Sequence, residues 1–184
     1  MKLLPSPDIS MNDWFNYFKK IFQESIPIGD LKIEDGELGL EDNVNEFNNE
    51  ITEDEIVSAI GQLKSRKACG SDKILAEMLK SSSSLLIPYL KVLFNAIFDN
   101  GIFPSIWRES VIVPLHKKGN RNDPNNYRGI SLISTLSKVF LHILNYRLQE
   151  WSEEHGMITE EQPCYQRGYN TLDNLFTLHG IVER

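Results

Sequence analysis

The sequence predicts an α+β fold that is mostly helical and contains one β-hairpin. Apolar residues recur at helical spacing over much of the chain after residue 50, which predicts a set of amphipathic helices. Two runs rich in valine and isoleucine flank the turn-forming segment NRNDPNN, and this arrangement predicts a hairpin at about residues 110–133. Hydrophobic residues make up 41% of the 184 residues, enough for one domain with a sizeable core.

Residues 1–50 are predicted to form a helix and an acidic, flexible linker, ahead of a second region at 51–184. The pattern of residues 12–24 is that of an amphipathic helix. Residues 26–49 are rich in Glu, Asp, Gly and Asn, a composition typical of a linker. The apolar face of this helix is an aromatic-rich stripe that consists of Trp14, Phe15, Phe18, Ile21 and Phe22. Such a stripe more often packs into a protein core than binds a partner, but without a domain to pack against it would be exposed.

A well-marked helix is predicted to begin after Thr52. Thr52 and Glu55 have the spacing of a capping box, in which each side chain accepts a hydrogen bond from the other residue's backbone N–H. Gly70 is expected to take the left-handed conformation that ends a helix. The basic residues before it can complement the helix dipole without any ligand, and they are Lys64, Arg66 and Lys67. The predicted buried face consists of Ile56, Ala59, Ile60 and Leu63.

Four further helices are predicted, at residues 74–80, 85–98, 135–154 and 171–183. Gly101 is expected to stop the second of these, and Ser134 to cap the third. Phe103 and Trp107 are expected to anchor the core ahead of the first strand. The predicted buried stripe of the third helix consists of Leu136, Val139, Phe140, Ile143, Leu144 and Leu148.

The predicted hairpin carries cations at its turn end. Lys117 and Lys118 follow the first run and Arg128 lies near the start of the second, so antiparallel pairing would bring the three charges together. Arg offers a planar fork for two phosphate oxygens, whereas Lys offers a mobile point charge. The pattern therefore predicts a clamp for a triphosphate or a nucleic-acid backbone. The alternative is that Arg128 pairs with a nearby carboxylate such as Asp123 and only holds the loop.

The strands and their connection carry two further expectations. The first run is rich in Val and Ile but alternates poorly, which is typical of a strand buried on both faces. The connection of about ten residues is longer than a tight hairpin requires, so the loop is expected to extend beyond the sheet.

Charge is distributed unevenly along the chain, whose net charge is −7. Residues 1–57 contain 4 basic and 14 acidic residues, a net charge of −10, whereas residues 58–184 carry a net charge of +3. Residues 104–150 alone carry +4. This distribution favours a polyanionic partner for the hairpin region. Ordinary scatter of surface charge is the alternative explanation.

Composition disfavours several classes of protein. No apolar run approaches the roughly 20 residues that span a bilayer. The N-terminus MKLLPSPDIS lacks the features of a secretory signal. We therefore expect an intracellular protein, nuclear or cytoplasmic, that is neither secreted nor embedded in a membrane. Cys69 and Cys164 match no metal-ligand spacing and are expected to be free thiols, and the four histidines show no zinc-site spacing either.

Three blocks of sequence resemble one family when they are taken in order. The first is ITEDEIVSAIGQLKSRKACGSDKILAEMLK at 51–80, the second joins IVPLHKKG to NNYRGISL and KVF, and the third is ITEEQPCYQRGYNTLDNLF at 158–176. Together they resemble the fingers region of reverse transcriptases from non-long-terminal-repeat (non-LTR) retrotransposons. The resemblance covers residues 51–184. It implies a partial polymerase fingers/palm fold and an N-terminal, fingers-side fragment of an RNA-directed DNA polymerase.

The resemblance also implies roles for basic residues. Lys117 and Arg128 match the family's nucleotide-binding positions. Lys67, Lys118 and Arg167 are candidate contacts with the template or with a nucleic-acid backbone. The implied partners are an RNA template, a DNA primer and a deoxynucleoside triphosphate.

The aspartate motifs that carry this family's chemistry do not occur before Arg184. Polymerases of this type use two divalent ions held by carboxylates. No catalytic residue, metal ligand or cofactor is therefore assigned to this chain, and Mg²⁺ is expected only in a complete family member. The chain is expected to lack much of the palm and to have no nucleotidyltransferase activity alone. The alternative is a non-enzymatic remnant of a mobile element that binds nucleic acid or a protein.

The third block departs from the family pattern at two positions. Cys164 stands where the family has glycine, and Gln166 stands where it has arginine, with Arg167 next to it. A cysteine would be strained wherever the backbone requires a positive φ. Such changes resemble those of a partial or decayed copy of a mobile element.

Overall fold

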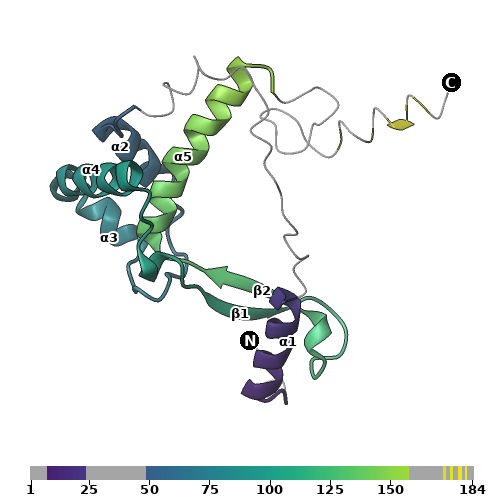
Figure 1. The fold of residues 1–184 in the computed structure, drawn as a ribbon. Coiled ribbons are helices and arrows are strands. Elements are labelled where there is room, and N and C mark those ends of the chain that lie inside the picture. The colour runs from purple at the N-terminus through teal and green to yellow at the C-terminus, as the bar shows by residue number, and fades with distance from the viewer. Residues whose placement is uncertain are drawn as a thin grey trace. The chain divides into compact units, whose positions relative to one another are not determined.

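The computed structural model describes residues 8–23 and 49–157, together with five helical positions between 172 and 181. Over these residues the fold is α+β, with helices and a two-stranded antiparallel sheet, as the sequence predicts (Figure 1). Two compact units divide within the last long helix, at Met1–Leu141 and His142–Arg184. The proposed boundary between residues 50 and 51 remains a prediction.

The elements follow the predicted order closely. The helices are α1 (Met11–Gln23), α2 (Glu53–Gln62), α3 (Ala76–Ser81), α4 (Ser83–Asn100) and α5 (Thr135–Glu154), and the strands are β1 (Val111–His116) and β2 (Tyr127–Leu132). Two short 3₁₀ turns, η2 (Ser105–Trp107) and η3 (Pro124–Asn126), precede the strands. Arg167 and Cys164 lie outside the described residues, as does most of the helix predicted at 171–183.

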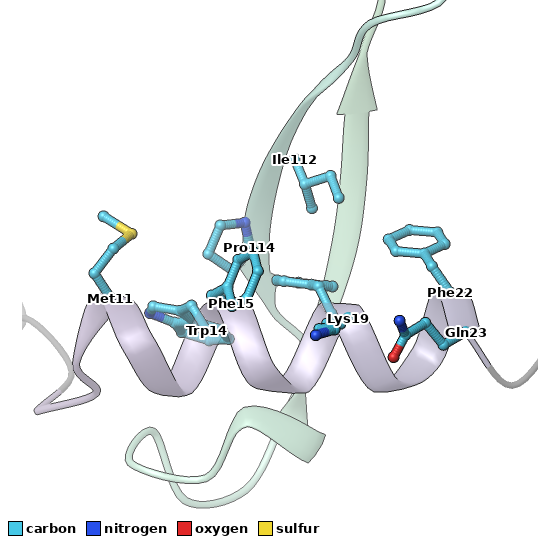
Figure 2. Close-up of a pocket in the computed structure, with 9 residues that line it drawn as sticks. Met11, Trp14, Phe15, Lys19, Phe22, Gln23, Ile112 and Pro114 are labelled. Carbon is cyan, nitrogen blue, oxygen red and sulfur yellow. The ribbon is translucent and has the colours of Figure 1, made fainter.

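Helix α1 lies against the hairpin, although the chain between them is long. Phe18 is its buried residue and Trp14 is half-buried, whereas Phe15, Ile21 and Phe22 are exposed. The exposed aromatic side chains border an open groove of about 670 Å³ between the helix and β1, with Ile112 and Pro114 on the strand side (Figure 2). The aromatic stripe is therefore partly packed and partly solvent-facing, between the two alternatives that its sequence allowed.

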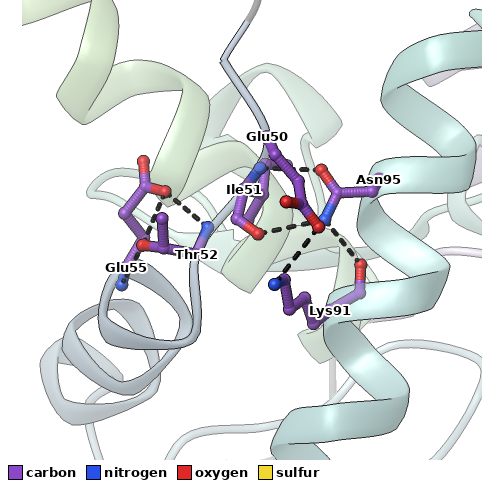
Figure 3. A network of polar contacts seen from close by, with 6 residues as sticks. All are labelled: Glu50, Ile51, Thr52, Glu55, Lys91 and Asn95. Carbon is purple, nitrogen blue, oxygen red and sulfur yellow. Dashed lines mark hydrogen bonds and ion pairs between the residues drawn. The ribbon is translucent and has the colours of Figure 1, made fainter.

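The helical core is held by caps and by the half-buried side-chain amide of Asn95. Thr52 and Glu55 form the predicted capping box at the start of α2, as Figure 3 shows. The side chain of Asn95 on α4 accepts a hydrogen bond from the Ile51 N–H (2.7 Å) and donates to the Ile51 carbonyl (3.0 Å). Because the Ile51 side chain is fully buried, this pair of bonds satisfies backbone groups that have left water.

An aromatic cluster joins α4, η2 and α5. Phe94 lies 6.2 Å from Trp107 and 5.5 Å from Phe140, measured between ring centroids. Phe103 lies 5.5 Å from Trp107. Phe94, Trp107 and Phe140 are buried and Phe103 is half-buried, so Phe103 and Trp107 anchor the core as predicted.

The predicted helix ends are confirmed for α4 and α5. Gly101 has a φ of 65° and its N–H donates to the Ile97 carbonyl (3.0 Å), closing α4. The buried hydroxyl of Ser134 accepts a hydrogen bond from the Ser137 N–H (3.3 Å) at the start of α5. Of the predicted α5 stripe, Val139, Phe140 and Ile143 are buried, Leu136 and Leu144 are half-buried, and Leu148 is exposed.

The prediction that Gly70 takes the left-handed conformation at the end of a helix was wrong. The residues with positive φ between α2 and α3 are Arg66 (59°) and Lys73 (58°), not Gly70. Gly70 is required for a close approach instead, because a Cβ there would lie 2.5 Å from the carbonyl carbon of Ile133. The glycine therefore lets this loop pass directly against the segment that joins β2 to α5.

Glu77 stabilises the turn that follows α2. Its carboxylate accepts a hydrogen bond from the Arg66 N–H, and this bond holds the pKa of Glu77 below its ordinary value of 4.5. A carboxylate with a lowered pKa in the folded state adds stability above the unfolded pKa, and that stability is lost as pH falls through the folded pKa.

We expect the stability difference between wild type and Glu77→Gln to be largest near neutral pH and to shrink as pH falls below about 4.5. Urea unfolding at a series of pH values measures this difference. Glu109→Gln, in an exposed loop, is the matched control. A difference that stays constant down to the acid limit would show that the Glu77 charge has no role in the turn.

Candidate functional site

The hairpin pairs β1 with β2 in an antiparallel register that places Leu115 opposite Arg128 and His116 opposite Tyr127. The Lys117 N–H extends the ladder by donating to the Asn126 carbonyl (2.8 Å). Because side chains alternate between the two faces of a strand, the register sorts the hairpin residues into two sets.

One face of the hairpin is covered by α1. Ile112, Pro114 and His116 on β1 share this face with Tyr127, and all four side chains are half-buried. The ring of Tyr127 lies edge-on to Trp14 of α1, with centroids 4.8 Å apart. Because α1 covers every second residue of β1, burial alternates along the strand.

The opposite face is apolar and exposed. It carries Val111, Val113, Leu115 and Ile130, with exposed fractions of 46%, 42%, 54% and 42%. The expectation that the first strand is buried on both faces was therefore wrong for the described chain. The run carries apolar residues on both faces, but only one face has a covering helix among the residues that the structure describes.

Two cations lie at the turn end of this exposed face. Arg128 is directly opposite Leu115, and Lys117 follows two residues later on the same face. Diagonal neighbours of this kind have Cα atoms about 7–8 Å apart, a separation that long side chains bridge. Both side chains are exposed, and no carboxylate of the described residues pairs with either of them. The predicted convergence of these two residues is compatible with this register.

The loop from Lys117 to Asn126 is held by its own polar groups. Gly119 has a φ of 84°, and the Asn126 side chain packs where a Cβ would stand at that glycine. Asn126 also donates to the Asn120 carbonyl (2.9 Å). Asp123 accepts hydrogen bonds from the N–H and the side chain of Asn125, at 3.0 and 2.8 Å, and so caps η3. Asp123 is thus engaged within the loop and forms no ion pair with Arg128.

The other predicted contacts are not brought to the same place. Lys118 lies in the loop beyond the paired register and is exposed. Lys67 lies in the exposed segment between α2 and α3, and the described residues show no contact between it and the hairpin tip. Arg167 lies outside the described residues. Of the predicted site residues that the structure describes, Lys117 and Arg128 are the two that share one face at the turn end of the hairpin.

Sequence reasoning missed the residues that shape the loop from the α1 side. Tyr127 donates its hydroxyl hydrogen bond to the Arg121 carbonyl (2.9 Å), and the ring of His116 lies 5.1 Å from the Tyr127 ring. The sequence does contain a signal for them. His116 directly precedes Lys117 and Tyr127 directly precedes Arg128, so strand alternation places both aromatic rings on the face opposite the charges.

Two exposed cations on one face of the hairpin can attract an anion. Arg128 and Lys117 present a fork and a point charge at the end of an apolar surface. Among the residues that the structure describes, no group of three or more His, Cys, Asp or Glu side chains could hold a metal ion. No helix in this part of the chain is long and apolar enough to cross a membrane.

Comparison with known proteins identifies the relatives of this chain. No family model matches it. The probable RNA-directed DNA polymerase from transposon BS of Drosophila melanogaster is 33% identical over 126 residues, which cover 68% of this chain and 14% of that protein. The probable RNA-directed DNA polymerase from transposon X-element of the same species is 33% identical over 71% of this chain and 14% of its own length. The chain belongs to the non-LTR retrotransposon polymerase family.

A third relative agrees with this assignment. The RNA-directed DNA polymerase from mobile element jockey of Drosophila melanogaster is 28% identical over 65% of this chain and 13% of that protein. The chain spans about one seventh of the length of the retrotransposon polymerases that it matches. The family resemblance seen in the sequence motifs is thereby confirmed.

Proposed function

We propose that this chain is the fingers-side segment of a non-LTR retrotransposon RNA-directed DNA polymerase, and that it holds the phosphates of the incoming nucleotide and the nucleic-acid backbone. The observation that carries this proposal is the pair Lys117 and Arg128, exposed on one face of the hairpin with no carboxylate partner in the described chain. Membership of a polymerase family supports a nucleotide or nucleic acid as the anion.

The two cations contribute differently to such a site. The Arg128 guanidinium can donate two parallel hydrogen bonds to one phosphate, which fixes its orientation, whereas the Lys117 ammonium adds charge without a fixed direction. Because both side chains are exposed, water and salt screen their attraction for an anion. The site alone is therefore expected to bind phosphate weakly, and with a strong dependence on salt concentration.

Nucleotide transfer needs more than this site. The reaction in such polymerases depends on divalent ions that carboxylates hold, and the described residues offer no cluster that fits them. The described part of the chain therefore supplies binding and orientation of phosphates in this proposal. Mg²⁺ would be held by other parts of a complete polymerase.

We expect that the purified chain will not extend a DNA primer on an RNA template with Mg²⁺ or Mn²⁺. The reason is that we assign none of the family's metal-binding aspartates to this chain. The measurement is incorporation of labelled deoxynucleotide, with a sample carrying Arg128→Ala as a control for contaminating polymerase. Incorporation above background that the Arg128 variant lacks would contradict this expectation.

A further inference from the structure

We infer that α1 is a positioning element for the hairpin loop, and that Trp14 is its central residue. The inference rests on the proposed function, because it concerns how Lys117 and Arg128 are held for an anion. Helix α1 lies on the face of the hairpin opposite these two cations. It can therefore influence the site without touching what the site binds.

The first connection runs through two aromatic rings. Trp14 contacts Tyr127 edge-on, and the Tyr127 hydroxyl donates to the Arg121 carbonyl inside the loop (2.9 Å). The Tyr127 ring also lies 5.1 Å from the ring of His116, whose Nε2 atom is 3.2 Å from the Gly119 carbonyl oxygen. One contact from α1 thus reaches two separate points of the loop.

The second connection is a hydrogen bond at the start of α1. The Asp8 N–H donates to the side-chain oxygen of Asn122 in the loop (3.1 Å). The helix begins three residues later, at Met11, after a reciprocal cap in which the Asp13 N–H donates to Ser10 Oγ (3.1 Å) and the Ser10 N–H donates to Asp13 Oδ2 (3.3 Å). The cap holds the first turn of α1 beside the loop.

The third connection explains the glycine next to Arg128. A Cβ at Gly129 would lie 2.7 Å from Phe18 Cε1, so the absence of a side chain lets the buried Phe18 ring lie directly on β2. Gly129 lies at a position of β2 that faces α1, whereas the side chain of its neighbour Arg128 lies on the opposite face. The contact therefore fixes the helix on the strand that carries the arginine.

These contacts matter because a flexible ten-residue loop would lose conformational entropy when it binds an anion. A loop ordered in advance binds an anion without that additional cost. With α1 in place, the Lys117 N–H stays hydrogen-bonded to the Asn126 carbonyl. This bond keeps the Lys117 side chain on the same face of the hairpin as Arg128. Loss of the Trp14 contact is expected to loosen the loop while the helical core stays folded.

The test compares Trp14→Ala with Phe15→Ala in the full chain. Phe15 is an exposed aromatic residue on the same helix and makes no ring contact with Tyr127 in the described structure, so it is the matched control. The first readout is hydrogen exchange of the loop amides of Lys117, Asn122 and Asn126, with the Gly101 amide at the end of α4 as an internal reference outside the hairpin. The second readout is fluorescence anisotropy with a labelled oligouridylate of about 12 nucleotides, within the site sizes of single-strand binders.

We expect Trp14→Ala to speed exchange of the loop amides about tenfold relative to Phe15→Ala, and to weaken RNA binding, with Gly101 unchanged. Trp14→Phe, which retains a ring beside Tyr127, should restore both readouts. Equal loop exchange in Trp14→Ala and Phe15→Ala would overturn the inference, as would faster exchange with unchanged RNA affinity. Absence of RNA binding by the wild-type chain would instead contradict the proposed function.

Discussion

Replacing Gly70 with alanine is expected to destabilise the chain by about 3 kcal/mol, the upper range for overpacking a well-filled site. The new Cβ would lie 2.5 Å from the Ile133 carbonyl carbon, 2.6 Å from the Ser134 nitrogen and 2.7 Å from the Ile133 carbonyl oxygen. These are backbone atoms, which cannot rotate away as a side chain can. The Ser134 cap of α5 and the hydrogen bond from Thr135 Oγ1 to the Ile74 carbonyl hold both sides of the contact in place.

Urea unfolding followed by circular dichroism measures this effect, and Gly61→Ala is the matched control. Gly61 lies in α2, and a Cβ there would meet no atom within 4 Å. Alanine is favoured over glycine inside a helix by about 1 kcal/mol, so this control should be slightly more stable than wild type. Equal stability of the two variants would show that the close approach at Gly70 is absent in solution.

Arg128→Ala is expected to weaken binding of single-stranded RNA about tenfold, and Lys117→Ala about threefold. A charge-assisted hydrogen bond contributes roughly 1.5–3 kcal/mol when well formed, and exposure to solvent reduces that contribution substantially. The arginine loses more because its fork can form two such bonds to one phosphate. Equilibrium anisotropy titrations of each variant, at one salt concentration, give the two ratios.

Arg108→Ala is the matched control for the arginine variant. Arg108 is an exposed arginine ahead of the first strand, away from the turn end of the hairpin. Its loss changes net charge by the same amount, so a general charge effect would weaken binding equally in both variants. That result would remove Arg128 from the proposed site.

Local signals predicted much of this fold because they depend on neighbouring residues. The capping box at Thr52 and Glu55, the stop at Gly101 and the cap at Ser134 each involve partners within four residues of each other. The hairpin bounds followed from turn formers and β-branched residues that lie next to each other in the chain. Such features are specified by spacing alone.

The rest depended on contacts between distant residues, which spacing does not reveal. The role of Gly70 required knowledge that its loop passes against Ile133, more than sixty residues away. The two faces of β1 could not be told apart because both are rich in apolar residues, and only the position of α1 distinguishes them. Within the candidate site, the positions of Lys117 and Arg128 were predictable from the strands, whereas their support by Trp14 and Tyr127 was not.

In the proposed function, Lys117 and Arg128 act together on phosphate. The most direct measurement is the salt dependence of RNA binding by wild type and by the Lys117→Ala/Arg128→Ala double variant, with circular dichroism to confirm that the variant is folded. For single strands, the slope of log affinity against log salt changes by about 0.7 for each phosphate contact. We expect a slope that is shallower by about 1.4 in the double variant, because two phosphate contacts are lost, together with weaker binding. A folded double variant with the wild-type affinity and the wild-type slope would contradict it.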